Sequence, residues 1–293
     1  MTPNDYDFLR NLLKQRSGLI LAPDKQYLVE SRLLPLVRKA GTDSIGGLLL
    51  KMQEPGAETL IADAVDAMTT NETFFFRDKI PFEQFRSVIM PALTKARSAQ
   101  RSIRIWCAAC STGQEPYSLA IALKEMGAAL AGWRFDIIAT DIATPVIDRA
   151  RDGVYNQFEV QRGLPIGLLL KYFEKNGDNW QVVPEIRSMV KFRQLNLLRD
   201  FSALGMFDLV FCRNVLIYFD HETKVDVLRR IALTMEADAF LVLGAAETVV
   251  GISDRFRPHP EHRGLYVPST QAMLQRVNSN VIPLVPRVAA SRI

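Results

Sequence analysis

The sequence predicts an α/β protein with a doubly wound parallel sheet, preceded by an all-helical segment. Residues 1–70 show only the periodicity of helices. From about residue 103, short apolar runs alternate with amphipathic stretches, which is the pattern of parallel strands joined by helices. One run, 207–212, is apolar almost throughout, as expected of a central strand that is buried on both faces.

The helical segment carries recognisable start and stop signals. Thr2 and Pro3 are typical of an N-cap followed by proline in the first turn, and Gly18 is typical of a helix end. Further helices are expected at 24–40, 43–52 and 57–69. Pro35 lies inside the first of these and is expected to kink or split it, because proline lacks a backbone donor and crowds the preceding turn. We therefore expect residues 1–70 to form a small helical bundle.

The α/β half is expected to contain five strands and a late edge strand. The strands are expected at 103–106, 135–139, 190–197, 207–212 and 240–244, and the edge strand at 263–267. Helices are expected at 116–126, from Thr144 to Gly153, near 165–174 and at 220–235. The stretch 154–189 interrupts this alternation, and its Asn176-Gly177-Asp178-Asn179 is typical of a hairpin turn. The tail 269–293 is expected to be disordered.

Composition narrows the class of protein. The net charge of +4 is small for a nucleic-acid-binding protein, so we expect no nucleic-acid partner. No apolar run reaches the roughly 18 residues that a membrane helix needs, and the first residues carry acids where a signal peptide needs lysine or arginine. Three cysteines, an odd and small number, are most simply read as free thiols. We expect a cytoplasmic protein that does not insert into membranes.

A small-residue turn and a carboxylate suggest a nucleoside-type ligand. The turn Cys110-Ser111-Thr112-Gly113 follows a predicted strand, and small side chains let a ligand approach the backbone there. The fingerprint G-x-G-x-x-G is absent, which argues against a dinucleotide. Asp141 ends the next predicted strand, where a carboxylate can accept the hydroxyls of a ribose. The alternatives are a tight turn without a ligand and an Asp141 that only caps the following helix, although Thr144 offers that cap.

The segment joining the two halves is unusual for a linker. Residues 68–78 contain three consecutive phenylalanines followed by Arg77, whereas a plain linker is polar and rich in glycine and serine. This segment has to pack its rings while it presents Asn71, Thr73 and Arg77. An arginine there can bind a carboxylate through two parallel hydrogen bonds.

Other tempting residues have plainer interpretations. Cys107 and Cys110 form a C-x-x-C pair, but no second pair completes the four ligands of a zinc site, so no metal site is expected. His259 and His262 are expected in a surface turn. The basic side chains of 25–39 either form a solvated face or contact an acidic partner.

Four motifs together resemble the CheR-type chemotaxis protein-glutamate O-methyltransferases. They are TTNETFFFRD at 69–78, CAACSTGQEPYSLA at 107–120, ATDI at 139–142 and FDLVFCRNVLIYF at 207–219, in the family's order and behind a helical domain. The resemblance covers about residues 5–267. It implies a class I methyltransferase fold that uses S-adenosyl-L-methionine and leaves S-adenosyl-L-homocysteine. It also implies a helical domain at 1–70, a linker at 71–92 that contributes to the cofactor site, and a methyltransferase domain at 93–268 with a small inserted β-subdomain at about 172–190.

The resemblance also implies the roles of particular residues. The cofactor contacts that it implies are Asn71, Thr73, Arg77, Glu115, Asp141, Asn196, Leu197, Asn214 and Val215. It places Arg77 and Tyr218 next to the reacting methyl group as the catalytic pair. The acceptor would be glutamate carboxylates on the cytoplasmic helices of a chemoreceptor, a methyl-accepting chemotaxis protein, giving methyl esters in chemosensory adaptation.

Some members of this family bind a tethering pentapeptide at the receptor's C-terminus through a longer turn. The equivalent stretch here, 172–183, is short, so we expect no such tether. Two other functions stay open from the sequence. One is a methyltransferase acting on RNA or a small molecule, although Arg213-Asn214-Val215-Leu216 stands where the N-P-P-Y signature of amino-group methylation would be. The other is a signalling module that binds the cofactor without catalysis.

Overall fold

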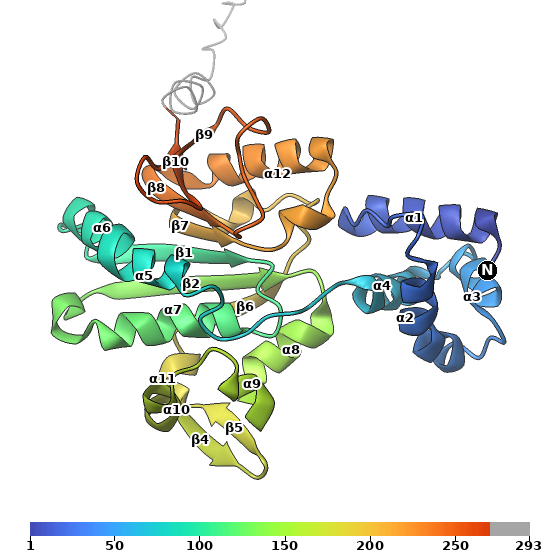
Figure 1. The fold of residues 1–293 in the computed structure, drawn as a ribbon, viewed down its shortest axis with the longest axis horizontal. Coiled ribbons are helices and arrows are strands. Elements are labelled where there is room, and N and C mark those ends of the chain that lie inside the picture. Colours follow the sequence, from blue (N-terminus) through green and yellow to red (C-terminus); the bar gives the residue numbers. More distant parts are fainter. Residues whose placement is uncertain (270–293) are drawn as a thin grey trace, which may run out of the picture.

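The computed structural model describes residues 1–269, and it consists of a helical domain, an α/β body and a small antiparallel sheet (Figure 1). The expected disorder of the tail therefore concerns residues that, apart from Ser269, lie outside the described range. No helix within residues 1–269 combines the length and hydropathy of a membrane span.

Four helices build the N-terminal domain. They are α1 (Pro3–Ser17), α2 (Gln26–Lys39), α3 (Ile45–Met52) and α4 (Glu58–Met68). Thr2 and Asp5 form a capping box at the start of α1, and Gly18 ends it in the left-handed conformation, as the sequence predicts. Of the two outcomes expected at Pro35, the split is wrong, because α2 runs through this residue without interruption, and the kink stays a prediction. Leu33 and Leu36 are buried on either side of this proline, so packing holds the helix where one backbone hydrogen bond is missing.

The seven-stranded sheet has the order β6-β2-β1-β7-β8-β10-β9. Its strands are β1 (Ser102–Ala108), β2 (Arg134–Asp141), β6 (Val190–Gln194), β7 (Phe207–Cys212), β8 (Met235–Leu243), β9 (Phe256–Pro258) and β10 (Leu265–Pro268). The first five in this order are parallel, while β10 runs antiparallel to β8 and β9. The predicted edge strand is therefore not an edge, since β9 covers β10. From β1 the chain first adds β2 and β6 on one side, and it then returns to add β7 and β8 on the other side of β1. The strand order therefore reverses between β1 and β7. In sheets of this kind, ligands bind at the carboxyl ends of the two strands that flank the reversal.

Helices and turns cover both faces of this sheet. The helices are α7 (Gln114–Glu125), α8 (Thr144–Asp152) and α12 (His221–Leu233), with short turns η2 (Gly127–Leu130), η3 (Ser202–Leu204) and η4 (Leu216–Tyr218). One buried cluster lies on the α7 side and a second on the α12 side, and both use alternate side chains of β1 such as Ile105 and Trp106. The strands therefore show the near-continuous apolar runs that the sequence analysis used.

The helices at 80–96 were not predicted from the sequence. Residues 80–96 form α5 (Ile80–Gln84), a π-helical turn η1 (Phe85–Ile89) and α6 (Met90–Ala96). Pro81 and Pro91 each lie in the first turn of their helix, which is a signal that could have found them. Phe82 and Phe85 from this segment pack on Phe211 of the central strand. This packing fixes the end of the linker to the α/β body.

A three-stranded sheet in the order β3-β5-β4 is inserted after α8. Its strands and helices are β3 (Val154–Tyr155), α9 (Gln157–Gln161), α10 (Ile166–Tyr172), β4 (Phe173–Asn176), β5 (Asn179–Val182) and α11 (Pro184–Arg187). The predicted hairpin is confirmed, since Asn176 pairs with Asn179 across a turn in which Gly177 is left-handed. The predicted fold class, a doubly wound α/β domain with a helical N-terminal domain and a small inserted β-subdomain, is confirmed.

The linker packs tightly against this small sheet. Phe75 is fully buried and makes edge-to-face contacts with Tyr155 at 5.0 Å and Phe173 at 5.3 Å. Gly163 lies against the same stretch with φ +85°, and a Cβ added there would lie 2.0 Å from the Phe75 carbonyl oxygen. No side chain fits at Gly163 unless the linker moves.

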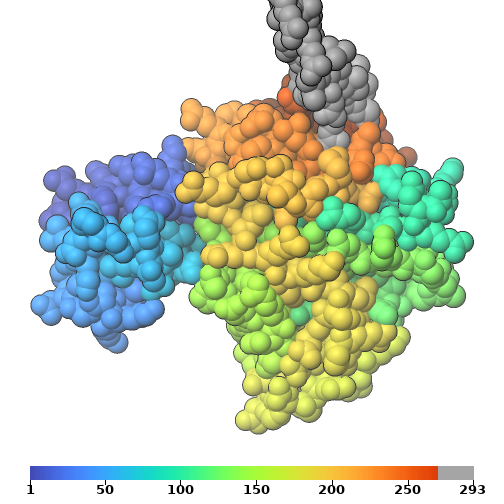
Figure 2. Space-filling view, turned by 180° about the vertical axis from the view of Figure 1, so that it is seen from behind, coloured from blue at the N-terminus to red at the C-terminus, as the bar shows by residue number. Residues whose placement is uncertain are grey.

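The end of α1 makes several polar contacts with the α/β body. The Arg16 carbonyl accepts a hydrogen bond from Asn196 Nδ2 at 2.6 Å, and the Ile20 N–H donates to the Tyr218 carbonyl at 2.9 Å. Lys14 pairs with Asp220 at 2.7 Å. From behind, Figure 2 shows the helical domain as a lobe against one side of the body. These contacts bring α1 to the carboxyl-end edge of the sheet.

We expect Gly163→Ala to destabilise the protein by more than about 3 kcal/mol, since both the left-handed backbone and the clash with Phe75 oppose it. Gly251→Ala is the matched control. Its φ is +75° but nothing lies within 4 Å of the added Cβ, so it should cost only about 1 kcal/mol. Thermal unfolding checks this, at roughly 2–4 °C per kcal/mol for a protein of this size. Equal melting temperatures for the two variants would contradict the prediction.

Candidate active site

A cleft opens between the helical domain and the carboxyl ends of the central strands. It holds about 910 Å³ of empty space, including the part that opens to solvent. Ten residues that the sequence analysis singled out line it: Asn71, Thr73, Arg77, Glu115, Asp141, Asn196, Leu197, Asn214, Val215 and Tyr218. The structure therefore brings all of these residues together, although they come from the linker, α7, three strand ends and η4. Their individual roles remain predictions.

The helical domain also contributes residues to the cleft wall, and these were not predicted from the sequence. Ser17 and Leu19, at the end of α1, line the cleft together with Phe219. A Cβ added to Gly18 would lie 2.9 Å from the Phe219 ring, so the chain approaches this ring closely. The helical domain is thus part of the cleft itself.

Asp141 is a buried carboxylate at the tip of β2. Its Oδ2 accepts the Ser111 N–H at 2.8 Å, and its Oδ1 accepts the Ala143 N–H at 3.1 Å. Burial raises the pKa of Asp141, and the backbone donors oppose that rise. The expectation that Thr144 caps α8 is wrong: the N-cap is Ala143, which has no side-chain oxygen to offer. Two backbone donors fix the carboxylate and leave it further lone pairs for a ligand.

The residues of the turn after β1 that line the cleft are not the full set that was expected, Cys110-Ser111-Thr112-Gly113. Ala109, Cys110 and Ser111 line the cleft, and Ala109 and Ser111 are left-handed without being glycine. Gly113 is not among the lining residues; it is needed for packing, because its φ is +93° and a Cβ there would lie 2.9 Å from the Ala150 Cβ. Non-glycine residues in this conformation cost energy, and such strain is concentrated at functional sites.

The cysteines of this turn are buried thiols. Cys107 and Cys110 are both free, and burial raises the pKa of each thiol well above its usual value. A thiol in this state is a poor nucleophile and a poor metal ligand. Within residues 1–269, no group of three or more histidine, cysteine, aspartate or glutamate side chains is arranged to hold a metal ion.

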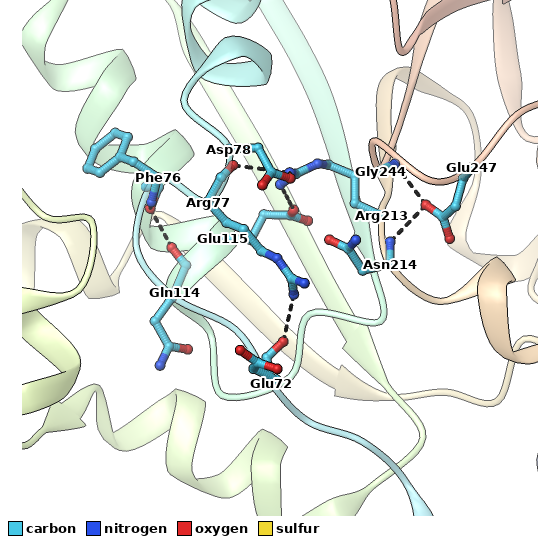
Figure 3. Close-up of polar contacts among 11 residues, drawn as sticks. Glu72, Phe76, Arg77, Asp78, Gln114, Glu115, Arg213, Asn214, Gly244 and Glu247 are labelled. Carbon is cyan, nitrogen blue, oxygen red and sulfur yellow. Dashed lines mark hydrogen bonds and ion pairs between the residues drawn. The ribbon is translucent and has the colours of Figure 1, made fainter.

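Arg213 links the linker to α7, and the sequence analysis missed it. Its side chain is 1% exposed and pairs with Glu115 at 2.8 Å and with Asp78 at 2.7 Å. The same guanidinium donates to the Arg77 carbonyl at 3.1 Å, and Figure 3 shows it between these three partners. Burial raises the pKa of Glu115, and the charge of Arg213 opposes that rise. The position of Arg213 directly after the central strand β7 was a signal in the sequence that could have pointed to it.

Linker residues are held to the α/β body by further hydrogen bonds. Ser111 Oγ donates to the Asn71 carbonyl at 2.7 Å, and the Phe76 N–H donates to Ser118 Oγ at 3.0 Å. Arg77 Nη1 donates to the Glu72 carbonyl at 2.8 Å (Figure 3). The rest of the Arg77 guanidinium has no hydrogen-bond partner in the described part of the chain, so it can bind an anion.

Two other predicted residues are partly engaged already. The side-chain amide of Asn196 donates to the Arg16 carbonyl and accepts the Leu198 N–H at 2.9 Å, and the Asn196 carbonyl accepts the Arg199 N–H at 2.9 Å. The Tyr218 carbonyl accepts the Ile20 N–H, whereas its hydroxyl has no partner among residues 1–269. The cleft therefore presents fixed carboxylates at Asp141 and Glu115 and unused donors at Arg77 and Tyr218.

Comparison with known proteins places this architecture in a family. The all-alpha domain of CheR methyltransferase matches residues 4–69, and the SAM binding domain of CheR methyltransferase matches residues 71–265.

Curated relatives match over most of their length. Chemotaxis protein methyltransferase 1 of Pseudomonas aeruginosa is 44% identical over 261 residues, covering 86% of this chain and 93% of the relative. Chemotaxis protein methyltransferase Cher2 of Pseudomonas putida is 41% identical, with the same coverage of both chains. Chemotaxis protein methyltransferase 1 of Vibrio cholerae is 40% identical and covers 85% of this chain and 90% of the relative. The resemblance drawn from the four motifs is confirmed: this chain belongs to the CheR methyltransferase family, with that family's all-α domain followed by its S-adenosylmethionine-binding domain.

Proposed function

We propose that this protein transfers a methyl group from S-adenosylmethionine to glutamate carboxylates on the cytoplasmic helices of a chemoreceptor, giving glutamyl methyl esters. Membership in the CheR methyltransferase family and the names of the chemotaxis relatives support the reaction and its setting. One observation carries the choice of acceptor: the cleft offers anion-binding donors at Arg77 and Tyr218, and no histidine or lysine among its described lining residues.

The residues of the cleft suit the cofactor. Asp141 is fixed by two backbone donors and can accept the ribose hydroxyls. Glu115 uses Oε2 for Arg213 and keeps Oε1 for an ammonium group. Asn196 and Leu197 follow β6 and would contact the cofactor, as the family resemblance implies. When bound, S-adenosylmethionine supplies a methyl group that is already activated by a sulfonium.

An ionised acceptor explains why no base is needed. A glutamate carboxylate has an ordinary pKa of about 4.3, so it is ionised at neutral pH. As its oxygen bonds to the methyl carbon, the carbon–sulfur bond breaks, the electron pair stays on sulfur, and no proton moves. The protein has to align the carboxylate with the methyl group and remove water from it, which can supply roughly 7–11 kcal/mol in well-oriented cases.

Arg77 and Tyr218 have complementary parts in this proposal. The free edge of the Arg77 guanidinium orients the incoming carboxylate, while Nη1 stays anchored on Glu72. Full ion pairing would lower the nucleophilicity of the carboxylate, so Arg77 acts by orientation. The Tyr218 hydroxyl positions the acceptor from the other side. We further propose that the protein acts in the cytoplasm, where receptor helices of this kind are accessible.

The acceptor is tested with labelled S-adenosylmethionine and membranes that contain a chemoreceptor. We expect the receptor to take up label that mild base releases as methanol, because esters hydrolyse where N-methyl groups do not. A receptor whose candidate glutamates are replaced by alanine is the control and should stay unlabelled. Base-stable label, or label on RNA or a small molecule instead, would contradict the proposed acceptor.

Two variants should distinguish cofactor binding from turnover, because each should change mainly one of them. Asp141→Asn should weaken binding of S-adenosylhomocysteine by about 10- to 100-fold, since a charge-assisted hydrogen bond is lost. Tyr218→Phe should leave that affinity within about twofold and lower kcat by about 10-fold or more. Calorimetry and initial rates measure the two effects. Asp148→Asn, an exposed change on α8, is the control. An Asp141→Asn variant with native affinity would exclude the ribose role.

We also propose that this protein works without a receptor pentapeptide tether. The β4–β5 hairpin turns through only Gly177 and Asp178 between its last paired residues, which supports the short form. Titration with a receptor C-terminal pentapeptide should give no binding in the low-micromolar range. Saturable low-micromolar binding would overturn this.

A further inference from the structure

We propose that Glu247 is a positioning residue that holds the acceptor side of the cleft, the segment 214–218, in its active shape. This inference rests on the proposed function, because it assigns that segment a part in binding cofactor and acceptor. Glu247 lies in the loop after β8 and does not line the cleft, so it acts through other residues.

The Glu247 carboxylate is surrounded by backbone donors. Its Oε2 accepts the N–H groups of Gly244 at 2.7 Å and Asn214 at 2.8 Å. Its Oε1 accepts those of Val215 at 3.0 Å and Leu216 at 2.7 Å, with a longer contact to Ile217 at 3.4 Å. Figure 3 shows the carboxylate facing Gly244 and Asn214. One side chain thus satisfies consecutive amides of a loop that has no strand or long helix to bond them.

The carboxylate that accepts these hydrogen bonds belongs to a buried side chain. Glu247 is 8% exposed and forms no ion pair within the described residues, so the backbone N–H groups alone compensate its charge. Hydrogen bonds to an ionised acceptor are roughly twice as strong as neutral ones. Losing the acceptor would leave the buried N–H groups of Gly244 and Leu216 unsatisfied, together with the partly buried ones of Asn214 and Val215. The carboxylate therefore dictates the path of this loop.

The loop conformation that Glu247 stabilises is strained, and residues of this loop line the cleft. Asn214 has φ +59°, a conformation that L-residues other than glycine rarely adopt. Asn214 and Val215 line the cleft, and η4 then delivers Tyr218. By binding the amides at the start of η4, Glu247 fixes both the strained residue and the direction of the turn that carries the Tyr218 hydroxyl.

Gly244 leaves the space that this arrangement needs. A Cβ at Gly244 would lie 2.8 Å from Asn214 Nδ2 and 2.8 Å from Glu247 Oε2. Its φ is not in the left-handed region, so the objection to a side chain is steric alone. Gly244→Ala would therefore push the carboxylate away from Asn214 without removing it, which gives a second, independent way to disturb the contact.

The first test is Glu247→Gln. A glutamine side chain has one oxygen, so it can accept from only one of the two sets of N–H groups, those that now bond to Oε1 or those that bond to Oε2. Its NH₂ group would face the N–H groups of the other set and could not accept from them. Hydrogen exchange should speed up by about 10-fold or more at the amides of 214–217 or at Gly244, and not in the strands β1 and β2. Affinity for S-adenosylhomocysteine should fall, and kcat should fall by up to about 100-fold, the effect of a small misplacement of reacting groups. Glu261→Gln, an exposed carboxylate in a loop, is the matched control and should change neither.

Local exchange separates positioning from general destabilisation, and it needs no methyl acceptor. If wild-type protein binds S-adenosylhomocysteine but esterifies no receptor, the proposed function fails while exchange and affinity still decide the role of Glu247. If Glu247→Gln does not fold, Gly244→Ala provides the same readouts, with Gly167→Ala, which meets nothing within 4 Å, as its control. Native exchange at 214–217 together with native affinity and turnover in a folded variant would overturn the proposal.

Discussion

The buried guanidinium of Arg213 is the interaction on which the rest of the site depends. It joins three segments far apart in the sequence: the end of β7, the start of α7 through Glu115, and the linker through Asp78 and the Arg77 carbonyl. Breaking a buried pair by removing one partner is strongly destabilising, at about 3–5 kcal/mol, because a charge is left without compensation. The acidic and basic residues around the cleft therefore hold its shape before any ligand is considered.

From this anchor the two sides of the cleft are built by different means. The linker side is held by side-chain hydrogen bonds such as Ser111 to Asn71, and by the rings of Phe75 and its neighbours packed against the small sheet. The opposite side is a short loop that depends on the Glu247 carboxylate. Left-handed residues at both sides, Phe76 and Asn214 among them, show that the backbone is held in costly conformations where ligands are expected.

Much of the fold could be predicted because strands and helices leave a periodic trace. Apolar runs located β1, β2 and β7, and Gly18 and Gly153 marked helix ends. Rules about single residues were less reliable: packing of Leu33 and Leu36 outweighed Pro35.

The candidate site was also only partly predictable from the sequence. Many residues of the four motifs could be proposed as cofactor contacts, whereas no role could be proposed for Glu247, or for Arg213 although it lies in the fourth motif. Their partners are side chains and backbone amides that only the folded chain brings near. A single glutamate in a loop resembles a solvated one until its donors are seen.

The end of α1 has a consequence for how the two domains communicate. Ser17 and Leu19 form part of the cleft wall, and the adjacent Arg16 and Ile20 backbones bond to Asn196 and Tyr218. A ligand that fills the cleft would contact both domains, and its affinity would then be linked to their relative position. Such linkage is reciprocal. If a partner that binds the helical domain changed the affinity for the ligand by some factor, the ligand would change the affinity for the partner by the same factor. Exchanging the helical domain between relatives would therefore keep these contacts only if residues 16–20 and the residues that they contact were exchanged together.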